Sequence, residues 1–338
     1  MKQVNLDCEG PITKNDNALE LCQYFIPQGE RFFSLISNYD DFLADILKRK
    51  GYKAGNTLKL ILPFLKAYGA SDKKIKDYSA SHLLFVPKAK KMLSYIRKAM
   101  PVFIISTSYQ PYIEALCEFL NFPKENSYFT SLNLDNYDIP QEEIKTLKEM
   151  AQEIINLPNI NLSQVKENSL PQKMKKSIKK LDEIFEDKIP FMKCGKILKE
   201  IDPVGGKKKA EAVLDSLKRK KGKLSDVMYV GDSITDVEAL KLVKDGGGIA
   251  ISFNGNFYAL KAAQIACISP DTSPLPVLAE LFYKKGKKTV LEMITEEANK
   301  LNASSTLAII SKDNLKPLAK ESEIMRKKVR GEKIGRLG

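Results

Sequence analysis

Short β-branched runs alternate with amphipathic stretches along most of this chain. The first run, residues 4–6, leads into Asp7 and Glu9, after which Gly10 and Pro11 break the backbone. Runs of this kind, bounded by Gly, Pro or polar residues, are typical of buried parallel strands. The others lie at residues 102–106, 226–232, 247–253 and 265–270. Strands that alternate with helices predict an α/β fold with a doubly wound parallel sheet and right-handed crossovers.

Two insertions interrupt this alternation. Residues 15–99 show apolar positions at three-to-four spacing and predict about four helices directly after the first strand. Residues 127–203 predict a second insertion with two charged amphipathic helices, near 141–156 and 173–186, and a polar loop between them. We therefore predict a core of residues 1–14 and 100–285, a helical cap of residues 15–99, and a basic helical extension. That extension, residues 286–338, should hold two or three helical segments and a frayed end.

Composition narrows the class of protein. The chain has 338 residues, 43% of them hydrophobic, and starts with neither a signal-peptide pattern nor any apolar run of membrane-spanning length. Five scattered cysteines without a C-x-x-C pair fit reduced thiols in a cytoplasmic protein. His82 is the single histidine, which argues against Ser-His and Cys-His triads.

The basic charge is local. Of the net +13, residues 193–223 carry +7 and residues 312–338 carry +5. Neither segment shows the interleaved aromatic residues that single-stranded nucleic-acid binders use, so a nucleic-acid partner is disfavoured. A solvated charged face is the simpler interpretation of both. A homodimer contact or a protein partner at residues 127–203 or at the basic tail stays open.

The strand ends carry the candidate chemistry. In a doubly wound sheet, ligands bind outside the carboxyl ends of the strands. Oxygen ligands suit Mg²⁺, and a lysine can balance phosphoryl charge, so this set predicts a magnesium and phosphate site. The residues concerned are Asp7, Glu9, Ser106, Asp232, Asp236 and a lysine cluster at 207–209.

These residues fall into four motifs: DCEGPIT, Ser106 after VFII, the lysine of GGKKKAEAV, and GDSITD. Their order and positions, spread over residues 1–285, resemble the haloacid dehalogenase superfamily of phosphatases. The chain is most similar to the phosphoserine-phosphatase-like branch, with a C1 cap and a D-x-E-G first motif. Glu9 departs from the aspartate that most of the superfamily has at this position.

The resemblance implies catalytic roles. Asp7 would be the nucleophile that forms an aspartyl-phosphate. Glu9 would act as general acid and then as general base. Ser106 would hydrogen-bond a phosphoryl oxygen, and the phosphate lysine would be Lys209, with Lys207 as the alternative. Mg²⁺ would be held by Asp7, the main-chain carbonyl of Glu9 and Asp232, and by Asp236 through water.

The resemblance also suggests where a substrate lies. Asp16 follows the first motif where the branch places an acid for the substrate amine, and Lys59 is the nearest basic candidate for its carboxylate. Thr107 and Asn254 are further candidates, although Asn254 could equally cap a turn. The residues 15–99 would close over the site as the family's cap.

The predicted function is therefore Mg²⁺-dependent hydrolysis of a small phosphorylated metabolite. A phosphotransferase would share every motif. A different class, a non-catalytic accessory protein on the same fold, also stays open, because the chain shows a weaker resemblance to archaeal proteins associated with energy-converting hydrogenases.

Overall fold

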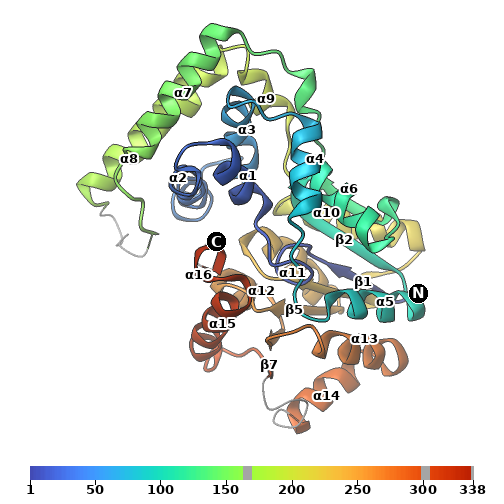
Figure 1. The fold of residues 1–338 in the computed structure, drawn as a ribbon. Helices are drawn as coiled ribbons and strands as arrows, with labels where there is room; N and C mark the ends of the chain where they lie inside the picture. Colours follow the sequence, from blue (N-terminus) through green and yellow to red (C-terminus); the bar gives the residue numbers. More distant parts are fainter. Residues whose placement is uncertain (163–169, 298–304, 336–338) are drawn as a thin grey trace.

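A computed structural model describes residues 1–162, 170–297 and 305–335 of the chain. Figure 1 shows the sheet at the centre of the fold. Within these ranges it has seven strands in the order β3-β2-β1-β4-β5-β6-β7. All neighbouring pairs are parallel except β6 and β7, which are antiparallel. The predicted doubly wound α/β fold is confirmed. The strands are β1 (Gln3–Leu6), β2 (Val102–Tyr109), β3 (Ser127–Thr130), β4 (Val227–Gly231), β5 (Ile249–Phe253), β6 (Ile265–Ile268) and β7 (Thr306–Ile309).

Alternation along the central strands separates two apolar layers. Val4, Leu6 and Val230 lie in the layer that packs under α5 (Ala89–Ala99), α6 (Gln110–Leu120) and α13 (Pro274–Lys285). Tyr229 faces the other layer, beneath α10 (Lys207–Lys220) and α11 (Val237–Asp245). The buried Gln3 and Asn5 point that way too and bond the Ser216 hydroxyl of α10 at 2.7 and 3.0 Å. Since buried polar groups must be paired, these bonds also orient α10 on β1.

The segment between β1 and β2 forms five α-helices, where the apolar spacing predicts about four. Four of them, α1 to α4, surround an apolar cluster above the carboxyl edge of the sheet (Figure 1). The fifth, α5, instead packs Met92, Leu93 and Ile96 into the core layer. The cap helices are α1 (Asn17–Phe25), α2 (Gly29–Asp41), α3 (Thr57–Ala67) and α4 (Asp72–Ser81), with a π-helical turn at Phe42–Ile46 after α2.

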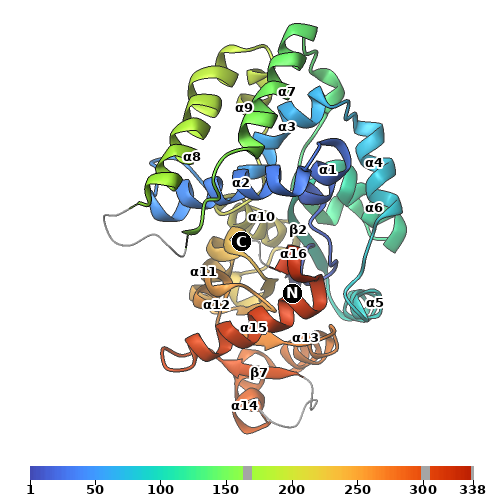
Figure 2. The same cartoon turned by 60° about the vertical axis from the view of Figure 1, so that its left-hand side comes forward.

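The second insertion extends the cap cluster. Its helices are α7 (Gln141–Ile155), α8 (Gln172–Asp182) and α9 (Gly195–Glu200), and a π-helical segment at Glu183–Lys188 follows α8. Leu147, Ile154 and Leu181 share one apolar cluster with Phe32 and Phe64 of the cap. Figure 2 shows α7 and α8 lying above α2. The segment is therefore anchored to the cap, while β3 at its start belongs to the sheet.

The C-terminal extension contains a strand as well as helices. Between α14 (Lys287–Glu297) and α15 (Leu315–Arg330) it contributes the edge strand β7. Helix α15 packs Leu318 against β6 and α12 (Phe257–Ala262), in front of the core in Figure 2. The short α16 (Glu332–Gly335) then places Ile334 against the cap cluster. The tail thus contacts both the sheet and the cap.

No helix in the described part of the chain is long and apolar enough to cross a membrane. The middle of the polar loop predicted between α7 and α8, at 163–169, and the end of the chain predicted to fray, at 336–338, lie outside the described residues.

Arg31 of α2 fixes the end of α7. Its guanidinium donates to the main-chain carbonyls of Ile155 and Leu157, the latter at 2.7 Å, and to the Asn159 side chain at 2.9 Å. Ile155 is the last residue of α7, so its carbonyl has no intrahelical donor, and Leu157 lies in the segment that follows. We predict that Arg31→Ala lowers the free energy of unfolding by about 1.5–3 kcal/mol, because charged hydrogen bonds are lost. Urea titration measures this. The exposed Arg97, which donates to one carbonyl, is the matched control. An equal loss in Arg97→Ala would contradict the role of Arg31.

Candidate active site

The loop after β1 brings the first motif under the end of β4. The Asp7 amide donates to the Val230 carbonyl at 2.9 Å, and the Cys8 amide donates to the Asp7 carboxylate at 2.7 Å. Gly10 follows with φ +110°, and a Cβ on it would lie 2.4 Å from the Asp232 carboxylate carbon. Only glycine permits both this backbone conformation and this approach. The loop therefore sets Asp7 and Asp232 side by side.

Lys209 is the cation at the centre of this edge. From the first turn of α10 its ammonium bonds an Asp7 oxygen at 2.6 Å and an Asp236 oxygen at 2.7 Å, with no solvent exposure. Burial opposes its charge, but Asp236 and Asp7 outweigh burial and raise the pKa of Lys209. Of the alternatives, Lys208 pairs with Asp202 on the surface, and Lys207 lines a different cavity, beside Tyr52.

Asp236 is fully occupied by protein donors. Besides Lys209, it accepts from the Tyr229 hydroxyl at 2.7 Å and from the Asp232 and Ser233 amides at 3.0 and 3.1 Å. Although burial works against ionisation, Lys209 and these donors hold the pKa of Asp236 below its usual range. Asp236 therefore orients Lys209 and the loop after β4, and a cation would reach it only through a bridging group.

Asp7, Asp232 and Asp236 form the acidic group that could hold a metal. Each offers one carboxylate oxygen within 4.8 Å of the others, and all three are buried. Hard oxygen ligands in this number suit Mg²⁺, which takes one or two carboxylates directly and completes its shell with water and phosphate. Because Asp236 is occupied, Asp7 and Asp232 are the residues that would bind the ion. Burial, then the neighbouring Asp236, raises the pKa of Asp7 well above its ordinary value.

Glu9 lies two residues after Asp7, on the side of the site that faces the cap. Its carboxylate accepts from the Asn17 amide at 2.8 Å, at the start of α1, while Asp16 caps the same helix through the Leu19 amide at 3.0 Å. Burial, and then the charge of Asp16, raise the pKa of Glu9 well above its usual range. A carboxyl group that keeps its proton to higher pH is suited to donate that proton.

These side chains enclose a cavity of about 130 Å³. Ser106 and Thr107 from the second half of β2 form one wall, and the Thr107 hydroxyl is buried without a hydrogen-bond partner among the described residues. Phe33, Ser37 and Thr57 of the cap form the roof. The structure therefore brings together Asp7, Glu9, Asp16, Ser106, Thr107, Asp232 and, through their bonds, Lys209 and Asp236.

Two predicted substrate residues lie elsewhere. Lys59 of α3 is not among the residues that line the cavity, and burial followed by the charge of Lys53 lowers its pKa. Asn254 has φ +46° and pairs both ways with the Ser269 backbone, at 2.7 and 2.8 Å. It closes the turn after β5, the alternative that its sequence position left open.

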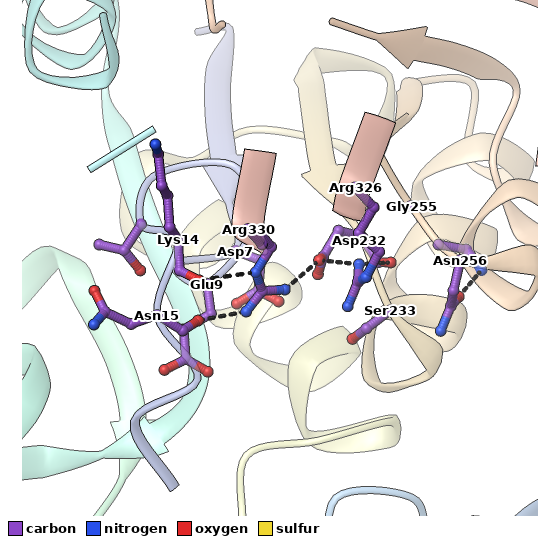
Figure 3. Close-up of polar contacts among 12 residues, drawn as sticks. Asp7, Glu9, Lys14, Asn15, Asp232, Ser233, Gly255, Asn256, Arg326 and Arg330 are labelled. Carbon is purple, nitrogen blue, oxygen red and sulfur yellow. Dashed lines mark hydrogen bonds and ion pairs between the residues drawn. The ribbon is translucent and has the colours of Figure 1, made fainter. Parts of the chain in front are cut away.

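Sequence reasoning missed two residues of this site, Arg326 and Arg330 of α15. Both line the cavity and both bond Asp232 (Figure 3). The available signal was their spacing of four with Ser322, which places all three on one face of a helix. That signal is weak in a segment as rich in charge as this tail.

The comparisons with known proteins agree with this geometry. A model of the haloacid dehalogenase-like hydrolase family matches residues 56–275, and the chain belongs to that family. A gene product of Archaeoglobus fulgidus has a similar structure, with 29% identity, a TM-score of 0.87, and coverage of 100% of this chain and 99% of that one. No curated protein matches the sequence.

Two further solved structures are more distant. A phosphoserine phosphatase in its apo form is 12% identical, with a TM-score of 0.42 over 78% of this chain and 92% of its own. A hydrolase of the same superfamily from Salmonella enterica serovar Typhi is 10% identical, with a TM-score of 0.44 over 75% and 62%. At these values neither informs the substrate of this chain.

Asp41, at the end of α2, lines the roof of the cavity, and its environment predicts a stability that depends on pH. Burial, followed by Asp40 and Asp45, raises its pKa to about 8. Between the ordinary value near 4 and this value the folded chain binds one more proton than the unfolded chain, so stability falls as pH rises. We predict that Asp41→Asn removes a slope of up to about 1.4 kcal/mol per pH unit between about pH 5 and 8.

Urea titrations across this pH range provide the measurement. The exposed Asp313 serves as the control position, and Asp313→Asn should keep the slope of the unmodified chain. If Asp41→Asn were as pH-dependent as the unmodified chain, the carboxyl group of Asp41 would not be the source.

Proposed function

We propose that the chain is a divalent-cation-dependent phosphomonoester hydrolase that acts on a small phosphorylated metabolite. The observation that carries this proposal is the buried bridge from Lys209 to Asp7 and Asp236, next to Asp232 at the carboxyl edge of the sheet. This arrangement offers a nucleophile, a cation for phosphoryl charge and carboxylates for a metal. The family match supports hydrolase chemistry.

The cavity supports a small substrate. A volume of about 130 Å³ lies well below the roughly 300–1,000 Å³ of drug-sized sites. The phosphoryl group would take the lower end, between Asp7 and the hydroxyls of Ser106 and Thr107. The leaving group would take the upper end, beneath Phe33 and beside Asp16. Asp16 is the candidate for an amine on that group, since it brings a carboxylate into the cavity wall.

Hydrolysis would proceed in two displacements. A carboxylate oxygen of Asp7 attacks phosphorus, the bond to the leaving oxygen breaks, and Glu9 gives that oxygen its proton. Glu9, now ionised, takes a proton from water as the water oxygen attacks phosphorus and the bond to Asp7 breaks. Lys209 stays protonated throughout and balances the charge on the phosphoryl oxygens. Mg²⁺ bound to Asp7 and Asp232 would supply further charge stabilisation.

Asp7→Asn tests the nucleophile. We predict that this variant loses hydrolysis of p-nitrophenyl phosphate in the presence of Mg²⁺, by a factor of about 10³ or more, because an amide does not form the covalent intermediate. The amide keeps an oxygen for the Cys8 amide, so circular dichroism should show an intact fold. The exposed Asp313→Asn is the matched control and should keep full turnover. Unchanged turnover in Asp7→Asn would exclude this mechanism, and a wild-type chain without turnover would favour the accessory role.

Glu9→Gln tests the acid and base. Because p-nitrophenolate leaves without help from an acid, the first displacement should persist while the second slows by about 10²-fold or more. Phosphoenzyme should therefore accumulate and be detectable as an acid-stable rise in intact mass. Glu20→Gln is the control, since Glu20 bonds Asn15 close by but does not line the cavity. Steady turnover without phosphoenzyme in Glu9→Gln would show that Glu9 has only a structural role.

A further inference from the structure

One face of α15 contacts the carboxyl edge of the sheet. Ser322, Arg326 and Arg330 recur every four residues and therefore share one side of the helix. The Ser322 hydroxyl donates to the Gly255 carbonyl at 2.7 Å, after β5. Both arginines reach Asp232, after β4 (Figure 3). The helix is therefore registered on the strand ends that form the site.

The two guanidinium groups make different contacts. Arg330 donates to the Lys14 carbonyl at 3.1 Å, to the Asn15 carbonyl, and to the Asp232 carboxylate at 3.0 Å, so it links the two sides of the site. Arg326 donates to the same carboxylate oxygen and to the Asp232 main-chain oxygen at 3.1 Å. Both side chains are only about one-twentieth exposed and line the cavity.

Charge balance gives these contacts a purpose. Seven carboxyl groups line the cavity or bond Lys209: Asp7, Glu9, Asp16, Asp40, Asp41, Asp232 and Asp236. Even with two of them protonated, the other five leave an excess of four negative charges after Lys209 is counted. One divalent cation would still leave the site with two excess negative charges. A phosphate dianion would be repelled from such a site, and more strongly because the site is buried. The two arginines remove that excess.

We propose that Arg326 and Arg330 are anion-binding residues of the active site, contributed by the C-terminal helix, which make the cation-loaded site able to accept a phosphate dianion. Asp232 is the partner that holds both guanidinium groups when no anion is present. This inference rests on the proposed function, since it takes phosphate as the anion. Residues 315–330 lie beyond the part of the chain that the family model matches.

Residue usage along the chain agrees with this role. Seven of the 55 basic residues are arginine, and two of the seven lie in this cavity. Arginine stays charged when buried and can present two donors to phosphate oxygens at once, whereas a buried lysine loses its charge more readily. Lysine suffices elsewhere on the tail, where Lys327 pairs with Glu323 at the surface.

The test uses the full chain and inorganic phosphate. Calorimetry at saturating Mg²⁺ measures phosphate affinity, and electron paramagnetic resonance measures Mn²⁺ affinity without phosphate. We expect Arg326→Gln and Arg330→Gln to weaken phosphate binding by at least about tenfold, because charged hydrogen bonds to an anion are lost. Mn²⁺ affinity should stay equal or increase, since positive charge is removed. Arg326→Lys and Arg330→Lys should recover part of the phosphate affinity.

Lys327→Gln removes one charge from the same helix outside the cavity and should change neither affinity. Unchanged phosphate affinity in both Gln variants would overturn the proposal. So would an equal loss of phosphate and Mn²⁺ affinity, which would mean that the arginines only hold Asp232 in place for the metal.

A second measurement uses the wild-type chain and does not depend on the folding of a variant. The arginine side-chain Nε–H signals of the wild-type chain, followed by NMR while phosphate is added at saturating Mg²⁺, should shift for Arg326 and Arg330. No shift would overturn the inference. If the chain is an active hydrolase but its phosphate affinity does not depend on either arginine, only this inference is wrong. If phosphate binding depends on the arginines but the chain shows no turnover, only the proposed function is wrong.

Discussion

The buried ammonium of Lys209 is the constraint on which this structure depends. An ammonium without solvent exposure is strongly unfavourable unless carboxylates surround it, and Asp7 and Asp236 do so at 2.6 and 2.7 Å. These three residues come from the ends of β1 and β4 and the first turn of α10. Their pairing therefore fixes how those elements meet, and it leaves the edge of the sheet rich in charge. The polar bonds of Gln3 and Asn5 to Ser216 hold α10 in the register that this pairing requires.

That concentration of charge explains why the C-terminal tail returns to the site. A carboxylate such as Asp232, next to Asp7 and Asp236, needs its own cation, and the nearest ones come from α15, almost 100 residues later. The tail reaches this point because β7 pairs with the edge strand β6 and directs α15 back across the strand ends. Ile334 then contacts the cap. The tail thus contacts the sheet, the site and the cap.

The sequence predicts the parts of this arrangement that follow from local pattern. Strand runs ending in Asp7, Ser106 and Asp232 imply one shared edge, because parallel strands end together. The resemblance of the lysine motif to that of the family favoured Lys209 over Lys207, and the structure places Lys209 against Asp7 and Asp236. Arg326 and Arg330 could not be found in this way, because a helix rich in lysine has the sequence pattern of a solvated surface. Only the position of Asp232 in the folded chain shows that these two arginines are buried. The strand β7 was missed for a similar reason: four residues carry little periodicity, and pairing with β6 decides their state.

The cavity draws its walls from segments that are far apart in the chain, and this bears on specificity. Asp7, Ser106 and Asp232 come from the core, Phe33 and Thr57 from the cap, and two arginines from the tail. Under the proposed function, the core would provide the groups for phosphoryl chemistry, whereas the cap and tail would limit what else fits in about 130 Å³. Because the second insertion packs on α2 and α3, it can influence the roof of the cavity without touching a substrate. Under the proposed function, the leaving group would be selected by the cap and tail together, and similarity in the core alone would not determine it.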